Sequence, residues 1–439
     1  MKGWVHDRIP RFRLSCFPLR PFNHGPTVRH WRSSMPTNSH DGLAMRSFQM
    51  LLLSCCLTTC AGYFGTYMRL PVVPLYARSF GADTVQIGMI NSSFFIMAGL
   101  LSLPLGILSD RLGRKALILA GLLISSATSF LLCLVDAPTQ MIWIYLLFGI
   151  GLACFAPTMM SLVADISPAT HLGRSYGWYT LAVYGGMSLG PAAGGWVAHW
   201  WGYKPVFLAS GAWILLVCLA VYVLLPESLH LRPAGYQKKP IAELARNLGR
   251  NLPLIACWLV TLGGCLGLGM FVTFVPVYAH EQGIGAGQIG LIFGAQALFN
   301  ALSRIPFGRL SDSVGQRSHL AVIGLIGLAV SIAGFGVSTN ITRFIAFAVL
   351  MGISMGLAFT TVGALISEVV SPDARGLAMG GYNTMVYFGM MLSSLLMGIV
   401  IRSFGFFISF AIVAGVNLVT TGIFYLMFSS RREAKADFT

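Results

Sequence analysis

The chain has 439 residues, of which 56% are hydrophobic and only 10% are charged, and its formal net charge is +15. Soluble domains carry about 25% charged residues, so this composition excludes an ordinary soluble domain and indicates a membrane protein. The net positive charge alone would suit a nucleic-acid-binding protein, but the positions of the basic residues favour another explanation.

Residues 1–46 form a basic segment without a long apolar run. The segment resembles neither a signal peptide nor a membrane span, and we expect a disordered cytoplasmic tail. Two alternatives stay open. One is a transit peptide, because such peptides are rich in Arg and Ser and poor in acidic residues; the other is an upstream extension before a start at Met35 or Met45.

About twelve apolar stretches come after this segment, each long enough to cross a hydrocarbon core about 30 Å thick as a helix. They are predicted at 48–77, 84–108, 115–135, 140–165, 174–198, 204–226, 253–279, 287–310, 318–338, 342–368, 376–400 and 404–428. Transmembrane β-strands would alternate apolar and polar residues, and these stretches do not. The sequence therefore predicts an all-α membrane protein with a six-helix bundle at 47–226, a cytoplasmic linker at 227–252, a second six-helix bundle at 253–428 and a cytoplasmic tail at 429–439.

The basic residues lie mostly on one side of this predicted topology. Most of the 29 Lys and Arg residues fall in the even-numbered loops and the two tails, whereas the odd-numbered loops hold Arg78, Lys204, Arg343 and Arg402. By the positive-inside rule, both termini and the linker face the cytoplasm. The excess charge then reflects topology and attraction to the anionic lipid bilayer, and we expect no nucleic-acid partner.

The two halves repeat each other at an offset of 202 residues (276 minus 74). The segment PLYA at 74–77 returns as PVYA at 276–279, and PLGILSD at 104–110 returns as PFGRLSD at 306–312. Two similar halves in a membrane protein are typical of a transporter, because the halves can rock and expose a central site to each side of the bilayer in turn.

A motif of glycines and charged residues comes directly after the second predicted span, where residues 106–115 read GILSDRLGRK. It resembles the Gly-x-x-x-Asp-Arg-x-Gly-Arg-Arg signature of the major facilitator superfamily, and the resemblance covers about residues 46–430. It implies two pseudo-symmetric six-helix bundles and a gate at their cytoplasmic ends. The predicted gate residues are Gly106, Asp110, Arg111, Gly113, Arg114 and Lys115, with Gly308, Asp312, Gly315 and Arg317 in the second half.

The residues of this motif suggest its chemistry. Gly106 would let two helices approach closely, and Asp110 could accept hydrogen bonds from Arg114 or from a helix N-terminus. In the family this cluster holds the cytoplasmic ends of the halves together in the outward-facing state. The alternative is that the basic residues only determine the topology.

Charged residues also flank the ends of the fourth and tenth predicted spans. Asp165 with Arg174, and Glu368 with Arg375, resemble gating charges of the superfamily and could tie adjacent helix ends together. The Ser-Pro pairs at these places are explained equally well by helix termination.

The fifth predicted span contains GMSLGPAAGG at 186–195. This sequence resembles the Gly-x-x-x-Gly-Pro-x-x-Gly-Gly signature of the drug:proton antiporters, carried here by Gly186, Gly190, Pro191, Gly194 and Gly195. Pro191 removes a backbone donor and bends the helix, and the glycines form a smooth packing surface. The resemblance implies an exporter; the alternative is an ordinary packing surface of small residues.

The chain departs from those antiporters in the fourth span, where it has Tyr145 in place of an arginine that takes part in proton coupling. In addition, no Asp or Glu lies near the centre of a predicted span. Proton antiport needs a protonatable group that both sides can reach. Coupling through a carboxylate at a helix end and facilitated diffusion without coupling therefore both stay open.

Arg69, in the outer third of the first predicted span, is the exception that we identify in an otherwise uncharged interior. A charge in the bilayer is costly unless it faces water, a partner or a ligand. Arg69 could bind an anionic group of the substrate, reach the outer interface, or pair with Asp136.

The resemblance implies that the first, fourth, seventh and tenth spans line the central path. Besides Arg69, the candidate cavity residues on these spans are Tyr63, Tyr67, Thr158, Thr273, Thr360 and Thr361, and those on flanking helices are Gln296, Asn300, Asn383 and Tyr387. Neutral hydrogen-bonding groups on an apolar wall suit an amphipathic organic solute better than a small inorganic ion.

These features favour a secondary active transporter over a membrane-bound enzyme or a receptor. The sequence has no Ser-His-Asp or Cys-His arrangement, no phosphate-binding loop and no metal-ligand spacing, so we expect no enzyme activity, cofactor or metal. We predict a monomeric efflux transporter for a small organic solute in the plasma (inner) membrane, with protons as the candidate counter-ion. The runner-up is an uptake permease or facilitator for an organic anion.

Overall fold

The structure is a computed structural model that describes residues 39–168, 171–225, 246, 248–314, 316–371 and 374–436. Its description of side chains leaves out residues 39–47, 103, 107, 110, 111, 172, 173, 312 and 429–436. Most of the predicted N-terminal tail and of the predicted linker therefore lies outside the described residues. The chain divides into two compact units, 1–47 and 48–439, and both helix bundles belong to the second unit.

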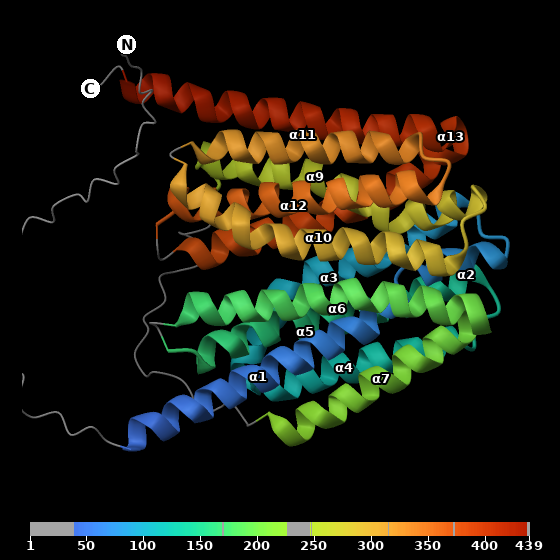
Figure 1. The fold of residues 1–439 in the computed structure, drawn as a ribbon, viewed down its shortest axis with the longest axis horizontal. Helices are drawn as coiled ribbons and strands as arrows, with labels where there is room; N and C mark the ends of the chain where they lie inside the picture. Colours follow the sequence, from blue (N-terminus) through green and yellow to red (C-terminus); the bar gives the residue numbers. More distant parts are fainter. Residues whose placement is uncertain are drawn as a thin grey trace, which may run out of the picture. The chain divides into compact units, whose positions relative to one another are not determined.

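Among the described residues, the long regular elements are all helices, and short connections join them (Figure 1). The first half contains α1 (Ser39–Met68), α2 (Val72–Ser79), α3 (Thr84–Leu112), α4 (Arg114–Leu132), α5 (Pro138–Ile166), α6 (Leu172–Trp201) and α7 (Tyr203–Leu224). The second half contains α9 (Leu252–Glu281), α10 (Ala286–Ser313), α11 (Arg317–Gly336), α12 (Ile341–Val369) and α13 (Arg375–Ala436). The first predicted span covers parts of α1 and α2, and each later one matches one of these helices or part of one.

Three boundaries differ from the prediction. The span predicted at 48–77 is broken at residues 69–71, because Pro71 has no backbone N–H to continue the hydrogen bonding of α1. α13 contains both of the last two predicted spans, which meet at Gly405, where φ is 77° and the backbone is not helical. α1 also begins at Ser39, inside the predicted tail.

Nine stretches of the described residues are long and apolar enough to cross a membrane, and the one in α13 holds two predicted spans. The predicted spans not counted among them are α6 and α10, which are 30 and 28 residues long. These two helices pack against each other between the halves, so they need a less apolar surface than helices that face lipid. The fold is thus an all-α membrane protein of two six-helix bundles.

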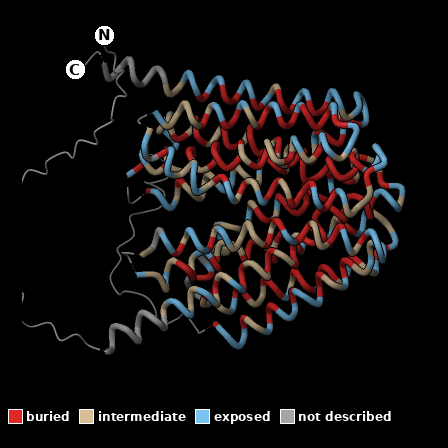
Figure 2. Tube along the Cα trace, in the orientation of Figure 1, coloured by how far each residue is buried: buried red, intermediate tan, exposed pale blue. Residues whose placement is uncertain are grey.

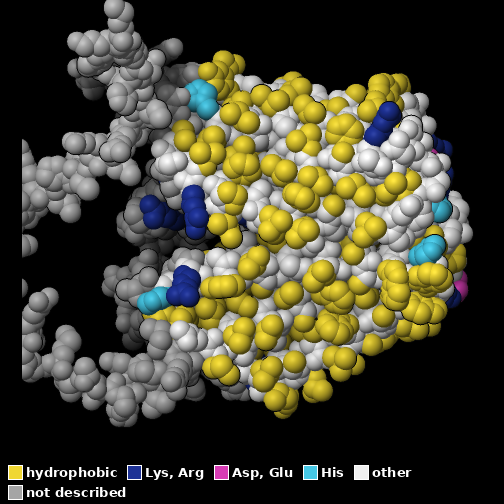
Figure 3. Space-filling view, viewed as in Figure 1, with side chains coloured by type: hydrophobic (Ala, Val, Ile, Leu, Met, Phe, Trp, Pro, Cys, Tyr) yellow, Lys and Arg dark blue, Asp and Glu magenta, His cyan; other side chains and the backbone are white. Residues whose placement is uncertain are grey.

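The surface of the helices fits a lipid environment. Figure 2 shows buried residues concentrated between the helices, and Figure 3 shows hydrophobic side chains spread over the visible face. Large apolar side chains such as Trp143, Leu216 and Val223 are more than 60% exposed. Since a water-soluble protein rarely exposes so large a contiguous apolar surface, the chain is an integral multi-pass membrane protein.

The two halves meet along two helix pairs, α3 with α13 and α6 with α10. A Cβ atom at Gly88 would lie 2.1 Å from the carbonyl oxygen of Ser394, and one at Gly195 would lie 2.5 Å from that of Ala286. These contacts lie at the end of the bundles where α9 ends and α10 begins, which we name the closed end. We name the opposite end, where α7 ends and α9 begins, the linker end.

At the linker end the corresponding glycines have more space. A Cβ atom at Gly106 or Gly376 would have no neighbouring atom within 4 Å among the described residues. Glycine therefore brings the halves into backbone contact at the closed end and does not do so at the linker end.

We expect Gly195→Ala to destabilise the closed end, because the added methyl group would meet the backbone of α10, and overpacking of this kind costs roughly 1–3 kcal/mol. The matched control on the same helix is Gly185→Ala, whose Cβ atom would have Cys60 Sγ at 3.7 Å as its one near neighbour among the described atoms. Thermal unfolding of the purified variants in detergent compares them. Equal melting temperatures would contradict a close approach at Gly195.

Candidate functional site

A cavity of about 310 Å³ lies between the two halves. Aromatic and aliphatic side chains form most of its wall, including Phe94, Phe148, Phe271 and Phe293. Its hydrogen-bonding groups come from α1, α6, α10 and α13, and they are Tyr63, Thr66, Tyr67, Tyr184, Gln296, Asn300, Asn383 and Tyr387. An apolar wall with a few polar groups is typical of a site for an organic molecule.

The structure brings together six of the cavity residues predicted from the sequence. Tyr63, Tyr67, Gln296, Asn300, Asn383 and Tyr387 all line the cavity. Thr158, Thr273 and Thr361 are fully buried and do not line it. Two of these hydroxyls bond within the protein instead: Thr273 Oγ1 lies 2.7 Å from Ser394 Oγ, and Thr361 Oγ1 donates to the carbonyl of Leu357 at 2.7 Å.

A second cavity of about 280 Å³ shares Tyr184 with the first and lies between α6, α10 and α12. Its lining includes Tyr176 and Thr180 of α6, Arg304 of α10, and the predicted residue Thr360 of α12. Tyr176 lies near the start of α6, so this second cavity extends from the central one toward the linker end.

Arg304 is an interior charge that was not predicted from the sequence. Its Nε donates to Asn300 Oδ1 at 3.0 Å, an Nη2 hydrogen bond reaches the Tyr184 hydroxyl in the other half, and its guanidinium carbon lies 4.4 Å from the centre of the Tyr184 ring. The sequence feature that could have identified Arg304 is its position inside the apolar span predicted at 287–310. Its counterpart 202 residues earlier is Ser102, so the repeat does not account for Arg304.

Arg69 lies behind the cavity wall. It is 0% exposed, its Nη1 donates to Ser129 Oγ at 2.8 Å and Thr128 Oγ1 at 3.2 Å, and its guanidinium carbon lies 3.8 Å from the centre of the Phe148 ring. Phe148 lines the cavity and Arg69 does not. Burial also rules out the predicted alternative that Arg69 reaches the outer interface, and among the described residues it forms no ion pair with Asp136.

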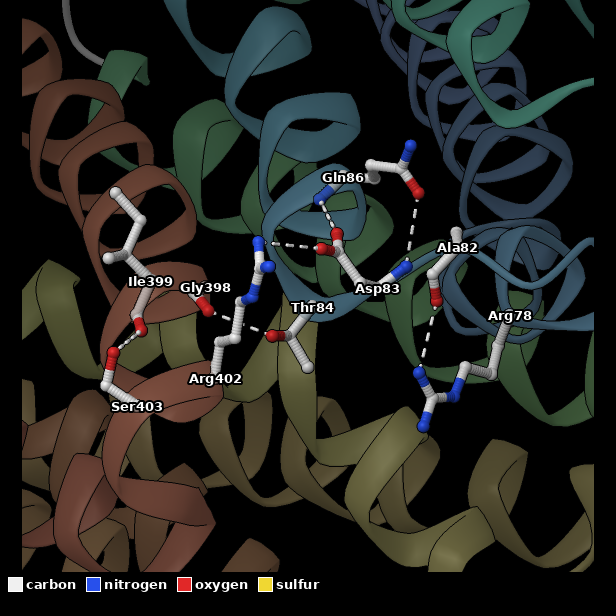
Figure 4. Close-up of polar contacts among 9 residues, drawn as sticks. All are labelled: Arg78, Ala82, Asp83, Thr84, Gln86, Gly398, Ile399, Arg402 and Ser403. Carbon is white, nitrogen blue, oxygen red and sulfur yellow. Dashed lines mark hydrogen bonds and ion pairs between the residues drawn. The ribbon is translucent and has the colours of Figure 1, made fainter.

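Polar contacts join the halves at the closed end. Arg78 of α2 forms an ion pair with Glu281 of α9 at 3.1 Å, and Asp83, at the start of α3, forms one with Arg402 of α13 at 3.4 Å. Figure 4 shows Arg402 directed at Asp83, with Thr84 Oγ1 donating to the carbonyl of Gly398 at 2.9 Å beside it. We name the two cross-half ion pairs the closed-end pairs.

Asp83 is held for this contact by its own helix. Its carboxylate accepts a hydrogen bond from the backbone N–H of Gln86 at 2.8 Å, and the Gln86 side chain accepts one from the backbone N–H of Asp83. This capping box fixes the start of α3. The side chains of the closed-end pairs are 37–69% exposed, so each pair contributes less than about 1 kcal/mol.

At the linker end the predicted gate and gating residues combine differently from the expectation. Arg114 Nε lies 2.9 Å from Asp165 Oδ2. In the second half Arg317 forms an ion pair with Glu368, and the two partners are 51 residues apart in the sequence in both pairs. Asp165 and Glu368 therefore bind the gate arginines of their own halves, and not Arg174 and Arg375 as predicted. The physical reason is that α3, α4 and α5 pack together within one half, and α10, α11 and α12 within the other.

Several other predicted gate residues lie outside the description or make no cross-half contact. Gly315 and the side chains of Asp110, Arg111 and Asp312 lie outside the described residues. Among the described atoms, a Cβ atom at Gly308 would have one near neighbour, a Thr360 methyl group at 3.9 Å, and Arg375 donates to the carbonyl of Ser367 at 3.2 Å. The role of Gly113 and Lys115 in a gate stays a prediction.

The glycines of the antiporter-like motif lie on two sides of α6. Cβ atoms at Gly186, Gly190 and Gly194 would lie 2.3, 2.5 and 1.8 Å from carbonyl oxygens of α1. Gly195 contacts α10 of the other half. Pro191 lines the cavity, and its carbonyl oxygen packs against Gly290 of α10. α6 is thus packed tightly between its own bundle and the opposite bundle.

The protein has a cavity between two similar helix bundles, and the bundles are in contact at one end of this cavity. This architecture is typical of a membrane transporter. The family model described as Major Facilitator Superfamily matches residues 55–287 and 257–438. The chain belongs to the major facilitator superfamily, which confirms the resemblance found in its motifs.

Its relatives agree with this assignment. An uncharacterised MFS-type transporter of Methanocaldococcus jannaschii is 23% identical over 368 residues, covering 82% of this chain and 95% of the relative. The quinolone resistance protein NorA of Staphylococcus aureus is 23% identical over 378 residues, covering 85% of this chain and 95% of that protein. The chain is therefore similar to a quinolone resistance protein along nearly its whole membrane part.

Solved structures show the same fold. A bacterial homolog of the human lysosomal transporter Spinster, in an inward-facing and occupied conformation, superposes with a TM-score of 0.73 at 16% identity, covering 88% of this chain and 97% of that chain. A POT family transporter in complex with a thioalcohol-conjugated peptide superposes with a TM-score of 0.74 at 13% identity, covering 88% and 96%.

We expect reversal of one charge, Arg78→Glu, to shift the protein toward a state with the closed end open, because two carboxylates would then face each other. The added change Glu281→Arg should restore the closed state. Each exposed pair is worth less than about 1 kcal/mol, so the population shift should be at most about fivefold. Distances between spin labels at Ser79 and Ser403 measure it, and an equal effect of the single and double variants would contradict a direct pair.

Proposed function

We propose that the protein exports small amphipathic organic molecules by alternating access. The observation that carries the proposal is the central cavity, which is lined by both halves, closed at one end by backbone contacts and continued toward the other end by the second cavity. A rocking motion of the halves would break the closed-end contacts and bring the linker ends together, which exposes the same cavity to the opposite side.

Charge supports an orientation in the membrane. Arg114, Arg174, Arg317 and Arg375 lie at the linker end, and the positive-inside rule assigns that end to the cytoplasm. Figure 3 agrees, since basic side chains gather at this end of the visible face. In this proposal both termini are cytoplasmic, the membrane is the plasma (inner) membrane, the structure is inward-facing, and one chain forms one complete path as a monomer.

Export is favoured over uptake by two observations. The similarity to NorA extends over nearly all of that protein, and its name assigns it to quinolone resistance. The Gly-Pro motif of the antiporters is complete in α6, where it packs against α1 and α10. An uptake permease or facilitator would use the same cavity, so the direction has to come from transport measurements.

The carboxylates that could bind a counter-ion lie away from the cavities. Among the described residues, no Asp or Glu lines either cavity, so a proton cannot bind to a carboxylate beside the substrate there. In the described part of the chain, the carboxylates that pair across the halves are Asp83 and Glu281 at the closed end. We propose that any coupling to a counter-ion acts through the closed-end pairs, because a cation bound at either carboxylate would compete with the arginine of that pair.

Transport into and out of proteoliposomes tests the proposed function, with a panel of fluorescent anionic, neutral and cationic amphiphiles and with or without a pH gradient. We expect Ala297→Trp to reduce transport at least about tenfold, because Ala297 lines the cavity and the indole would fill part of it. The control is Leu298→Trp, the neighbouring position on α10, which is 45% exposed on the helix surface.

Transport that is lost in the Ala297→Trp variant and kept in the control supports the central cavity as the path. Equal transport in both variants would contradict it. Transport of a probe only toward the linker-end side of the membrane would show uptake and contradict export. Transport rates that do not change with the pH gradient would exclude protons as the counter-ion.

A further inference from the structure

Arg304 is the one charged side chain among the described residues that line the two cavities. We infer that the transported molecules carry an anionic group and that Arg304 binds this group. The inference rests on the proposed transport function and adds to it the charge of the substrate and the residue that recognises this charge.

The guanidinium group of Arg304 is held in place with part of its donor capacity unused. Asn300 accepts from Nε, and the Tyr184 hydroxyl accepts from Nη2. The Tyr184 ring lies under the cationic carbon at 4.4 Å. Nη1 makes no hydrogen bond to the residues that the structure describes, and a guanidinium group has five N–H donors in a planar arrangement. The free donors fit the two oxygens of a carboxylate or the oxygens of a sulfonate or phosphate group.

No described carboxylate neutralises the charge of Arg304. Arg304 forms no ion pair with a described carboxylate, and a guanidinium group stays protonated in proteins. A charge at membrane depth is costly unless it meets water, a partner or a ligand. An anion bound at Arg304 would remove this cost, whereas a cationic substrate would increase it.

The other interior arginine, Arg69, cannot take this role. Arg69 is fully buried between two hydroxyl groups and the Phe148 ring, and it lines neither cavity. Arg304 is only partly buried, lines the second cavity, and is hydrogen-bonded to Asn300 and Tyr184, which line the central cavity. A molecule that enters from the linker end therefore meets the charge of Arg304 and not that of Arg69.

The rest of the site fits the apolar part of such a molecule. Tyr184 belongs to both cavities, and the aromatic rings of Phe271, Phe293 and Tyr387 also line the central one. Gln296 and Asn383 provide neutral hydrogen bonds on this wall. The substrate class is then an organic anion whose carboxylate, sulfonate or phosphate group lies at Arg304 and whose aromatic or aliphatic body occupies the central cavity.

Three probes with one fluorescent body and different charges test the inference: dansylglycine, which is anionic, dansyl amide, which is neutral, and dansylcadaverine, which is cationic. Their binding to the purified full-length protein is measured by dansyl fluorescence and by the rise in melting temperature. We expect dansylglycine to bind at least about tenfold more tightly than the other two, since hydrogen bonds to charged groups are among the stronger ones.

Arg304→Gln should abolish this preference, and Arg304→Lys should keep part of it because it retains the charge without the planar donor arrangement. Arg309→Gln, an exposed arginine on the same helix outside both cavity linings, should leave the preference unchanged. If the glutamine variant does not fold, the comparison of wild type with Arg304→Lys still decides, because an equal preference in both would exclude recognition by the guanidinium fork.

Transport of the same probes separates this inference from the proposed function. Equal binding and transport of all three probes by the wild type would overturn the inference and leave the exporter standing. Binding of dansylglycine that depends on Arg304, without transport of any probe, would support the anion site and contradict the exporter.

Discussion

The backbone contact between the halves at the closed end is the constraint on which the rest of the structure depends. Backbone atoms of one half occupy the places where Cβ atoms would stand at Gly88, Gly195, Gly290 and Gly398. Dispersion contacts of this kind are small singly and large in sum, whereas the two exposed ion pairs there are worth less than about 1 kcal/mol each. Close packing at the glycines therefore contributes most of the free energy that holds the closed end together. The ion pairs fix how the two halves are aligned with each other.

α6 transmits this constraint to the cavity. Its glycines at 186, 190 and 194 face the backbone of α1, and Gly195 faces α10, so α6 has little freedom to move independently of either neighbour. Ser188 Oγ also donates to the carbonyl of Gly294 across the interface at 2.9 Å. Pro191 and Tyr184 of the same helix line the cavity. A change in how α6 contacts α10 therefore alters the cavity wall and the closed end together.

The helices and the family could be predicted from the sequence because both depend on local signals, namely apolar length and the motif at 106–115. The contacts between the halves could not, since no spacing along the chain relates Arg78 to Glu281 or Asp83 to Arg402. Of the six predicted residues that line the cavity, Tyr63 and Tyr67 lie on a span that the family resemblance gave as lining, and the other four lie on flanking helices. The resemblance did not give the direction in which Thr158, Thr273 and Thr361 point. Arg304 was missed although the cost of a charge inside a span marks it as plainly as Arg69.

The two interior arginines show how burial separates a structural charge from a functional one. Arg69 is surrounded by hydroxyl groups and an aromatic ring and lines neither cavity, so its charge stabilises the packing of the α1–α2 connection against α4 and α5. Arg304 lines the second cavity, is hydrogen-bonded to two residues that line the central one, and keeps unused donors. With Arg304 and no carboxylate in the described cavity lining, the lining side chains carry a net positive charge. The field of this charge disfavours a lipophilic cation and favours an anion before any specific contact forms.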